Sequence, residues 1–325
     1  MSSHRRPSRT AKLARSRFEL AVHEPFRLDL TASALRRVPT NAVDVLTPAG
    51  EYVHAFAAPH GPMIARVAQP RPDALDVTVE GDARDAAAHQ RVPSLVGRTL
   101  GVDRDLTPFY QAAARLRWLA PLARRMRGIK PPRYRSLWES VVNSVVFQQV
   151  SLHSATAVVR RMAVALGTPV DGAGAPLYVF PDAERVLRAS DAELRATGLS
   201  TAKVATLRRA GEAIGSGALT DAMIEERTSP DAAALLRQTK GIGPWTASVI
   251  LLRGFGRLDV FPRNDSGVAR NLALVAGGRP PDVDDVLDAL GPQHGMLYFH
   301  LLLARLETRG EVGDAATPRR PLRSK

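Results

Sequence analysis

The chain has 325 residues, enough for two domains or for one large domain with an appendage. Hydrophobic residues make up 45% of it and charged residues 24%, as in soluble globular proteins, and no apolar run approaches the roughly 20 residues that span a bilayer. Cysteine is absent, which excludes disulfides, zinc knuckles, iron–sulfur clusters and thiol catalysis. The N-terminus has no apolar stretch after its first charges, so we expect no secretory signal and a cytoplasmic protein.

The net charge of +13 is unevenly distributed along the chain. Residues 1–17 hold six basic side chains and no acidic one, and residues 309–325 hold five basic and two acidic ones. We predict that both segments are disordered basic tails, for which solubilisation and binding are equally good interpretations. Residues 106–138 contain eight Lys or Arg and no acid, which favours a nucleic-acid partner through release of counterions from phosphates.

The N-terminal part has the pattern of a small antiparallel sheet. Apolar and polar residues alternate, and turns rich in Pro and Gly separate the candidate segments. We predict a β-rich N-terminal domain at 18–100, with one helix near 31–37. Its strands are expected at 18–22, 26–30, 42–46, 51–56, 62–68 and 75–79.

From about residue 84 the pattern becomes helical. The predicted fold class is therefore α+β, a small antiparallel β domain followed by an all-helical core at 101–308. Helices are expected near 109–119, 136–148, 151–166, 182–188, 191–196, 201–214, 231–239, 244–254, 266–275, 283–289 and 293–306.

The segment 231–254 predicts a helix-hairpin-helix. One helix ends near Lys240, a Gly-hydrophobic-Gly turn with Ile242 packing inward reverses the chain, and Pro244 opens the second helix. Backbone N–H groups at such a turn bind phosphate without reading sequence. A plain helix corner is the alternative, but the order GIGPWTA favours phosphate binding by Lys240, Gly241, Ile242, Gly243 and Thr246.

This hairpin resembles that of the helix-hairpin-helix (HhH-GPD) DNA glycosylase superfamily, nearest the bacterial 3-methyladenine DNA glycosylase II type. Two further segments carry the resemblance: LDVFPRNDSGV at 258–268, and GIKPPRY at 128–134 leading into FQQVS at 147–151. The likeness is strong over 128–306 and moderate over the N-terminal sheet. It implies an all-helical glycosylase core.

The resemblance places the catalytic carboxylate at Asp265. Cleavage of an N-glycosidic bond builds positive charge on deoxyribose, and a nearby carboxylate can stabilise that charge and orient or deprotonate a water. The alternative role of Asp265 is to cap a helix N-terminus. The two roles are compatible, because a capped carboxylate is rigidly oriented.

Trp245 stands where family members that also cut the DNA backbone carry a Schiff-base lysine. The resemblance therefore implies a monofunctional enzyme, with Trp245 stacking on the extruded base; a space-filling core tryptophan is the alternative. Ser266 and Gln293 match family positions that hold pocket aromatics, which implies a more polar base pocket. Gln149 matches the side chain that fills the gap in the base stack, and Gln148 beside it is expected to be structural.

Together these residues predict a monofunctional glycosylase that removes alkylated purines, of the 3-methyladenine and 7-methylguanine type, from duplex DNA. The alternatives are a non-catalytic DNA-binding module, a bifunctional glycosylase/lyase for oxidised purines, or a glycosylase for another lesion. We expect a monomer with damaged double-stranded DNA as its partner, no membrane association, no cofactor and no metal site. By resemblance alone, a monovalent cation could bridge hairpin carbonyls to phosphate.

Overall fold

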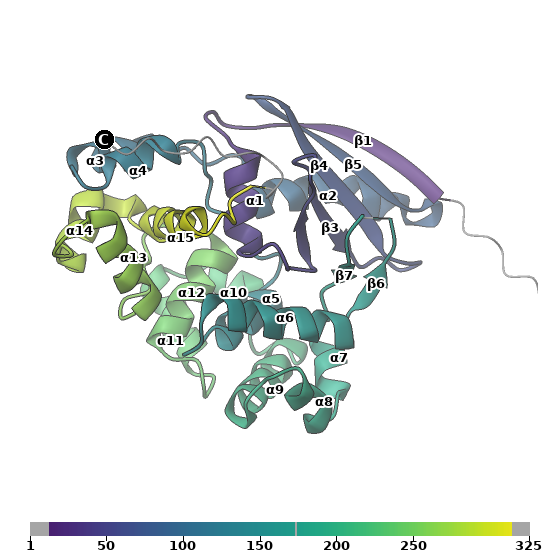
Figure 1. Cartoon of the computed structure of the whole chain (residues 1–325). Coiled ribbons are helices and arrows are strands. Elements are labelled where there is room, and N and C mark those ends of the chain that lie inside the picture. Colours follow the sequence, from purple (N-terminus) through teal and green to yellow (C-terminus); the bar gives the residue numbers. More distant parts are fainter. Residues whose placement is uncertain (1–12, 173, 314–325) are drawn as a thin grey trace, which may run out of the picture.

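The computed structural model describes residues 13–172 and 174–313. Its N-terminal part is a five-stranded antiparallel sheet with the strand order β1-β5-β4-β3-β2 (Figure 1). The alternation of apolar and polar residues explains the sheet, because successive side chains point to opposite faces. The strands are β1 (Leu13–Ala21), β2 (Asp44–Leu46), β3 (Tyr52–Phe56), β4 (Met63–Arg71) and β5 (Ala74–Asp82).

Strand β1 begins earlier than the sequence suggests. Residues 13–17, predicted to belong to a disordered tail, pair with β5, where Arg15 lies opposite Glu80 and Arg17 reaches diagonally to Asp76. Cross-strand ion pairs of this kind favour strand pairing, and both are present here. In the predicted C-terminal tail, residues 309–313 likewise contact the fold, and the Gly313 N–H donates to the Ser33 hydroxyl at 2.9 Å. Residues 1–12 and 314–325, the rest of the two predicted tails, lie outside the described residues.

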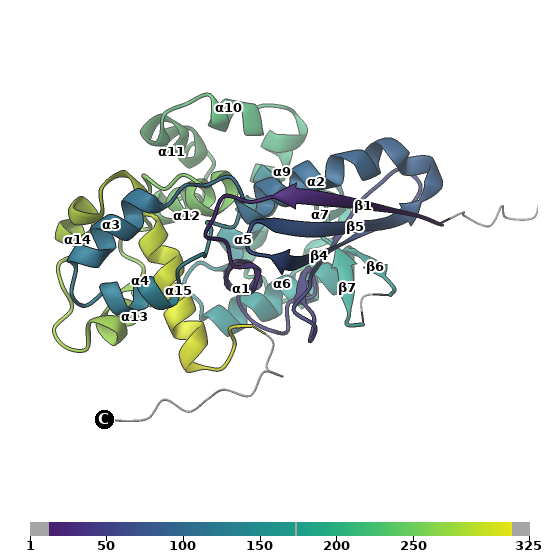
Figure 2. The same ribbon diagram turned by 90° about the horizontal axis from the view of Figure 1, so that it is seen from above.

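Helix α1 (Leu28–Arg36) replaces the strand predicted at 26–30. Apolar residues at 26, 28 and 30 fit a strand, but those at 28, 32 and 35 equally fit a helix buried on several sides. All of its residues except Asp29 are buried, since α1 lies between the sheet and the helical part of the molecule (Figures 1 and 2). Burial on every side therefore overrides a five-residue alternation.

Helix α1 contributes to two hydrophobic clusters. Leu28 and Leu35 pack with the sheet and with the long helix α2, whereas Leu30 and Ala34 pack with α15 and its neighbours. The helical part is built around this second cluster and a third one. Its 15 helices are α1, α2 (Ala86–Leu100), α3 (Thr107–Arg115), α4 (Ala120–Arg125), α5 (Leu137–Val146), α6 (Leu152–Leu166), α7 (Ala183–Arg188), α8 (Asp191–Ala196), α9 (Thr201–Gly215), α10 (Asp221–Glu225), α11 (Ser229–Arg237), α12 (Pro244–Phe255), α13 (Ser266–Ala276), α14 (Val283–Leu290) and α15 (Met296–Thr308), counted among the described residues.

Several elements were not predicted. Besides α2, α4 and α10, the chain forms a hairpin of β6 (Thr168–Val170) and β7 (Leu177–Val179), which packs on the far side of the sheet. The Tyr178 N–H donates to the Ala42 carbonyl at 2.8 Å. Within the described ranges, no helix has both the length and the apolar character needed to cross a membrane.

A buried charged network joins the sheet to the helices. The Arg135 guanidinium donates to Asp44 at 2.7 Å and also pairs with Glu139, one turn into α5. Burial alone would raise the pKa of the Asp44 carboxyl, but Arg135 and His54 hold that pKa well below its usual range. Removing one partner would leave a buried charge unpaired, so this network fixes the sheet against α5.

The basic stretch at 106–138 does not form one exposed surface. Lys130 is 1% exposed and donates from Nζ to the Arg104 carbonyl, and burial lowers its pKa to about 8. Burial likewise lowers the pKa of Arg133 to about 10, and Arg135 belongs to the network above. Three of the eight basic side chains therefore turn inward, while five remain exposed, and a nucleic-acid contact by those five stays a prediction.

Candidate active site and DNA interface

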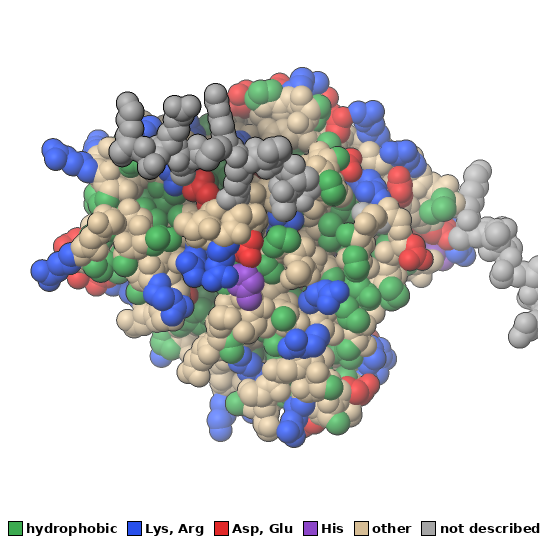
Figure 3. Space-filling view, viewed as in Figure 1, with side chains coloured by type: hydrophobic (Ala, Val, Ile, Leu, Met, Phe, Trp, Pro, Cys, Tyr) green, Lys and Arg blue, Asp and Glu red, His purple; other side chains and the backbone are tan. Residues whose placement is uncertain are grey.

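A cleft of about 1050 Å³ opens where the N-terminal ends of α6, α9, α12 and α13 face α15. The ends of four helices place partial positive charge around it, which favours anions. Among the described residues that line the cleft, five are basic (Arg37, Lys203, Arg270, Arg305 and Arg309) and one is acidic (Asp265). Lys and Arg side chains gather near the centre of this face, over α15 and α6 (Figure 3).

The hairpin between α11 and α12 forms part of the rim. Gly241 has φ +104, and a Cβ there would lie 2.0 Å from the Thr206 hydroxyl, so both backbone and space require glycine. Ile242 is 4% exposed and packs inward, as predicted. Gly243 differs from Gly241, because its φ is −89 and a Cβ would meet nothing within 4 Å. Nothing within the described fold therefore requires glycine at 243.

Asp265 lies at the N-terminus of α13 with its carboxylate on the cleft. Its Oδ1 accepts hydrogen bonds from the backbone N–H groups of Gly267 at 2.7 Å and Val268 at 3.0 Å. Its Oδ2 accepts from the Trp245 indole at 2.9 Å. Asp265 is thus a helix cap and a cleft residue together, and three N–H donors fix the orientation of its carboxylate.

Trp245 therefore has a contact that neither predicted role included. It follows Pro244 in the first turn of α12 and lines the cleft half-buried. Its Nε1–H joins the hairpin to Asp265 across 20 residues of sequence. The tryptophan consequently links the turn that precedes α12 to the carboxylate that begins α13.

The loop at 147–151 forms the rim beside the hairpin. Gln149 lies at its exposed tip with φ +56, a conformation that is strained for a residue other than glycine. Gln148 Nε2 donates to the Gly241 carbonyl at 3.0 Å and to the Thr246 hydroxyl at 2.8 Å. Lys203 Nζ donates to the carbonyls of Val146 and Gln148, both at 2.9 Å. The loop is therefore held by two side chains while the side chain of Gln149 is left exposed.

Two predicted site residues have other roles. Gln293 does not line the cleft; its Oε1 accepts from the Phe109 N–H and its Nε2 donates to the Asp105 carbonyl, so it ties down the start of α3. Thr246 is 2% exposed and its hydroxyl accepts from Gln148, but the residue still lines the cleft. Family resemblance and motif order assigned Gln293 to the base pocket and Thr246 to phosphate binding, respectively, but local packing directs their side chains to other partners within the protein.

The remaining predicted residues lie near the rim. Ser266 begins α13 and lines the cleft. Lys240 is exposed, and its carbonyl accepts from Arg209 at 3.1 Å. Within residues 13–172 and 174–313, no three His, Asp or Glu side chains come together as ligands for a metal ion.

Three cleft residues were missed in the sequence. Phe147 and Tyr298 supply aromatic surface that the prediction of a more polar pocket did not include. Arg37, from the end of α1, also lines the cleft although it is only 3% exposed. Phe147 directly precedes the two glutamines and could have been suspected from that position, whereas nothing local to residues 36–38 indicates that Arg37 reaches the cleft.

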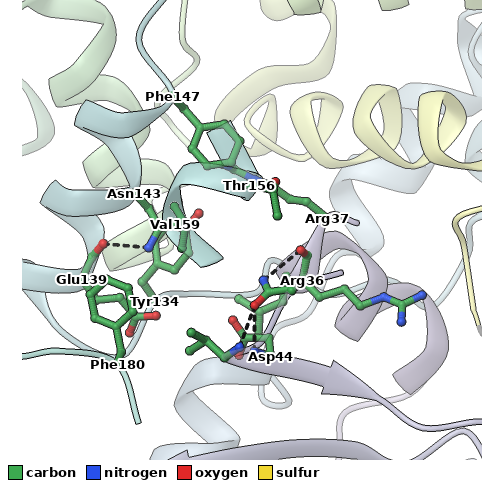
Figure 4. Close-up of a pocket in the computed structure, with 13 residues that line it drawn as sticks. Arg36, Arg37, Asp44, Tyr134, Glu139, Asn143, Phe147, Thr156, Val159 and Phe180 are labelled. Carbon is green, nitrogen blue, oxygen red and sulfur yellow. Dashed lines mark hydrogen bonds between the residues drawn. The ribbon is translucent and has the colours of Figure 1, made fainter. Parts of the chain in front are cut away.

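Arg37 and Phe147 line both the cleft and a small internal cavity, which Figure 4 shows. The guanidinium lies over the Phe147 ring, with its Cζ 3.6 Å from the ring centroid. Burial and the neighbouring Arg253 lower the pKa of Arg37 from its usual value. The cavity itself, bounded by Asp44, Glu139 and Asn143 among others, has a volume of about 10 Å³, enough for one water at most.

Comparison with known proteins matches the site to a family. The model of the "HhH-GPD superfamily base excision DNA repair protein" family matches residues 142–290, which include the hairpin, Trp245 and Asp265. The chain is 28% identical over 192 residues to a protein of Bacillus subtilis named DNA-3-methyladenine glycosylase, covering 59% of this chain and 63% of that one. It is 28% identical over 281 residues to a Mycobacterium tuberculosis protein named "Probable bifunctional transcriptional activator/DNA repair enzyme AlkA", covering 84% of this chain.

The chain thus spans 63% and 54% of the lengths of these two curated relatives. Among solved structures, a 3-methyladenine DNA-glycosylase from Archaeoglobus fulgidus has the same fold, with a TM-score of 0.72 and 22% sequence identity. That likeness covers 89% of this chain and 99% of the other, so the N-terminal sheet and the helical part both take part in it. Residues 142–290 of the chain therefore belong to the HhH-GPD superfamily of base excision DNA repair proteins.

Proposed function

We propose that this protein is a monofunctional DNA glycosylase of base excision repair. It hydrolyses the N-glycosidic bond of alkylated purines, of the 3-methyladenine and 7-methylguanine type, after they are extruded from duplex DNA. It works as a monomer on chromosomal DNA in the cytoplasm. The family match and the names of the relatives support this proposal, and the cleft supplies the chemistry.

The observation that carries the proposal is the setting of Asp265. One carboxylate stands on a cleft whose other charged lining residues are Lys and Arg, and three N–H donors hold it. A residue that served only as a helix cap would not need a second element to bind its other oxygen. Asp282 provides the comparison, because it caps α14 through Oδ1 with two N–H donors and does not line the cleft.

In the reaction, the bond between C1′ and the base nitrogen breaks and both electrons leave with the base. Positive charge develops on the sugar, and the Asp265 carboxylate stabilises it electrostatically. Water then adds to C1′ and loses a proton, leaving an abasic site. An alkylated purine that already carries a positive charge leaves as a neutral molecule, so a modest pocket suffices for such lesions.

DNA is held by contacts that do not read sequence. The N–H groups of Gly243, Trp245 and Thr246 donate to no acceptor elsewhere in the described residues, so they are available to a phosphate oxygen. Glycine at 243 allows that oxygen to approach the backbone closely. Arg270, Arg305 and Arg309 add positive charge along the same cleft. Binding of the DNA backbone accounts for the excess of basic residues along the cleft.

Gln149 fills the gap that the extruded nucleotide leaves in the stack. Its strained backbone and exposed side chain, on a loop fixed by Gln148 and Lys203, fit that role. Gln149→Gly would relieve the strain and remove the side chain. We expect slower base release from this variant at unchanged stability, because extrusion becomes less favourable.

The absence of a lysine at 245 supports a hydrolase without lyase activity. A Schiff base needs an amine that can reach C1′. Lys203 is the lysine among the described residues that line the cleft, and its Nζ donates to two carbonyls that hold the loop at 147–151. Borohydride should therefore trap no covalent complex with DNA; a trapped complex would favour the bifunctional alternative.

The proposal is tested by base release from a duplex that contains 7-methylguanine. The full chain should release the base, Asp265→Asn should lose about 10³-fold or more in single-turnover rate, and both should bind an abasic-analogue duplex equally well. Asp282→Asn is the matched control and should keep the full rate. Asparagine also caps helices, so neither substitution should unfold the protein.

Two results would overturn the proposal. If the wild-type chain binds duplex DNA but releases no base from a panel of alkylated, deaminated and oxidised lesions, it is a non-catalytic binding module. If it releases bases and Asp265→Asn does so at the same rate, another group performs the chemistry. Release of a different lesion in preference to alkylated purines would correct the substrate and leave the role of Asp265 standing.

A further inference from the structure

One side chain joins the loop at 147–151 to the phosphate-binding hairpin. Gln148 is half-buried, and its Nε2 donates to the Gly241 carbonyl at 3.0 Å and to the Thr246 hydroxyl at 2.8 Å. These two acceptors lie on either side of Gly243 in the sequence, whose N–H group is offered to a phosphate. A primary amide nitrogen carries two hydrogens, so both are used within the hairpin and the orientation of the amide is fixed.

Helix α9 makes a second connection between the same two parts. Lys203, Thr206 and Arg209 are spaced three residues apart on α9, and side chains at this spacing share one helix face. Lys203 holds two carbonyls at the loop, and Arg209 donates to the Lys240 carbonyl in the hairpin at 3.1 Å. Thr206 packs so closely against Gly241 that a Cβ there would lie 2.0 Å from its hydroxyl. The spacing between loop and hairpin is therefore fixed by a helix as well as by the direct amide link.

The residue that follows this anchor is held in a costly conformation. Gln149 has φ +56, and its side chain is exposed at the tip of the loop beside Val150, which is 44% exposed. A left-handed backbone at a residue other than glycine persists where the neighbouring structure enforces it, often at a functional site. The Lys203 bond to the Gln148 carbonyl and the amide link of Gln148 fix the peptide that precedes Gln149. The tip is therefore presented outward before DNA arrives.

We propose that Gln148 is a positioning residue, which sets the tip of the loop at a fixed distance from the phosphate-binding turn so that backbone binding drives Gln149 into the base stack. This inference rests on the proposed glycosylase function and concerns extrusion of the nucleotide, not cleavage of the bond. Unpairing and unstacking a base costs free energy. A rigid link lets the free energy of phosphate binding offset that cost, because the backbone contact and the insertion of the tip then form together.

Another glutamine shows what a purely structural bridge looks like. Gln69 Nε2 donates to the Phe26 carbonyl at 2.9 Å and its Oε1 accepts from the Leu28 N–H at 2.9 Å, which ties β4 to the start of α1 away from the cleft. Both glutamines bridge two elements, but the bridge of Gln148 also lies between two proposed DNA contacts. A structural bridge serves every substrate alike, whereas a bridge for extrusion matters most when the base is paired.

The test compares one lesion in two settings, using the full chain in single-turnover reactions. 7-Methylguanine is placed opposite cytosine in a duplex, or in a single-nucleotide bulge with no base opposite, where extrusion is less costly. Gln148→Met keeps the length of the side chain and removes both donors. Its rate should fall at least about 10-fold for the paired lesion and less than about 2-fold for the bulged one. The ratio of the two rates does not depend on how much of the protein is folded.

Two further variants show whether the effect belongs to this loop. Gln69→Met is the matched control and should leave the ratio of the two rates at the wild-type value. Lys203→Met releases the same loop from α9 and should change the ratio in the same direction as Gln148→Met, because the tip again loses its fixed distance from the hairpin.

A double-mutant cycle separates positioning from general stability. With Gln149→Gly the tip is absent, so Gln148→Met should lower the paired rate by less than about 2-fold further, whereas independent effects would multiply. Extrusion is also measured directly in the Asp265→Asn background, from the fluorescence of 2-aminopurine beside the lesion, because that base brightens when it is unstacked. Gln148→Met should slow this signal at least about 10-fold, since the step that it reports is the one being positioned.

Three results would each overturn the positioning role: equal losses for the paired and bulged lesions, an unchanged paired rate, or fully multiplicative effects with Gln149→Gly. If the wild-type chain releases no 7-methylguanine from either substrate, the proposed function fails instead. The 2-aminopurine signal then still decides the role of Gln148, because it reports extrusion without bond cleavage.

Discussion

The two walls of the cleft are built in different ways. The reaction wall, which we define as Gly243, Trp245 and Asp265, comes from one short stretch of chain and is held largely by backbone N–H groups. The recognition wall, defined as Arg37, Phe147 and Tyr298, comes from three segments that are far apart in sequence. It is held by packing and by the clamp of Arg253 on α1.

This difference separates chemistry from selection. A carboxylate that must meet C1′ is oriented best by short, rigid connections, and a hairpin followed by a helix cap provides them. Side chains that contact the base and determine which bases fit can come from any element that reaches the pocket. Under the proposed function, the pocket surface can therefore vary without disturbing Asp265, and the variants below probe mainly the reaction wall.

Among variants that leave Asp265 in place, the largest effect is expected from Gly267→Ala in the reaction wall. A Cβ at 267 would lie 2.9 Å from the Asp265 Oδ1, and the carboxylate is the part that can move. A displacement of this size should lower the rate of base release about 100-fold. Stability should hardly change, because the backbone of Gly267 suits alanine. Gly278→Ala, whose Cβ would touch nothing within 4 Å, should leave the rate at the wild-type value.

Trp245→Phe keeps an aromatic ring and removes the hydrogen bond to Asp265. We expect single-turnover base release to fall roughly 10-fold, since one of three donors to the carboxylate is lost. Trp138→Phe removes an indole hydrogen bond of the same length, to the Pro181 carbonyl, away from the cleft. It should lower the unfolding temperature and spare the rate. Equal rates for the two variants would mean that Trp245 does not position Asp265.

Alanine substitutions at the two hairpin glycines should have different effects, one on stability and the other on DNA affinity. Gly241→Ala meets positive φ and a contact with Thr206, so the free energy of unfolding should fall by about 2 kcal/mol or more. Gly243→Ala has room for its Cβ, so stability should hold while affinity for duplex DNA drops several-fold. Denaturant unfolding and a binding titration at fixed salt measure the pair. Unchanged DNA affinity in Gly243→Ala would contradict the proposal that a phosphate binds at this turn.

The smallest effect concerns His300, on the helix that carries Tyr298. Burial lowers its pKa to about 4, from 6.5 in the unfolded chain. Below pH 6.5 the unfolded chain takes up a proton that the folded protein refuses, so stability falls as the pH drops from about 6.5 to about 4. The slope from this group is at most about 1.4 kcal/mol per pH unit. The difference in unfolding free energy between wild type and His300→Gln should shrink by that slope; a constant difference would contradict it.

Sequence reasoning predicted the reaction wall because its signals are local. The order GIGPWTA, the spacing to Asp265 and the glutamines at 148 and 149 all lie within short segments. Their hydrogen bonds were not predictable, since the bond from Trp245 to Asp265 depends on how α12 and α13 meet. The sheet and most helices were likewise predicted by periodicity, including the helix near 31–37. The first turn of α1, at 28–30, was predicted as a strand, because its burial comes from distant elements.

The recognition wall gave no such signal. Arg37 lies in a pair of arginines after a buried helix, a pattern that usually marks a solvent-exposed helix end. The basic stretch at 106–138 is the reverse case. Its charge indicated an exposed surface for nucleic acid, but Lys130 and Arg135 make buried contacts instead. Long-range packing decides both outcomes, and a single sequence does not encode it in any short pattern.

A structure of Asp265→Asn bound to a duplex with one 7-methylguanine tests the central claim most directly. The account predicts that the damaged nucleotide is out of the helix, with C1′ beside the residue 265 side chain and a phosphate at the Gly243 turn. A lesion still stacked in the duplex, or a C1′ remote from residue 265, would contradict it.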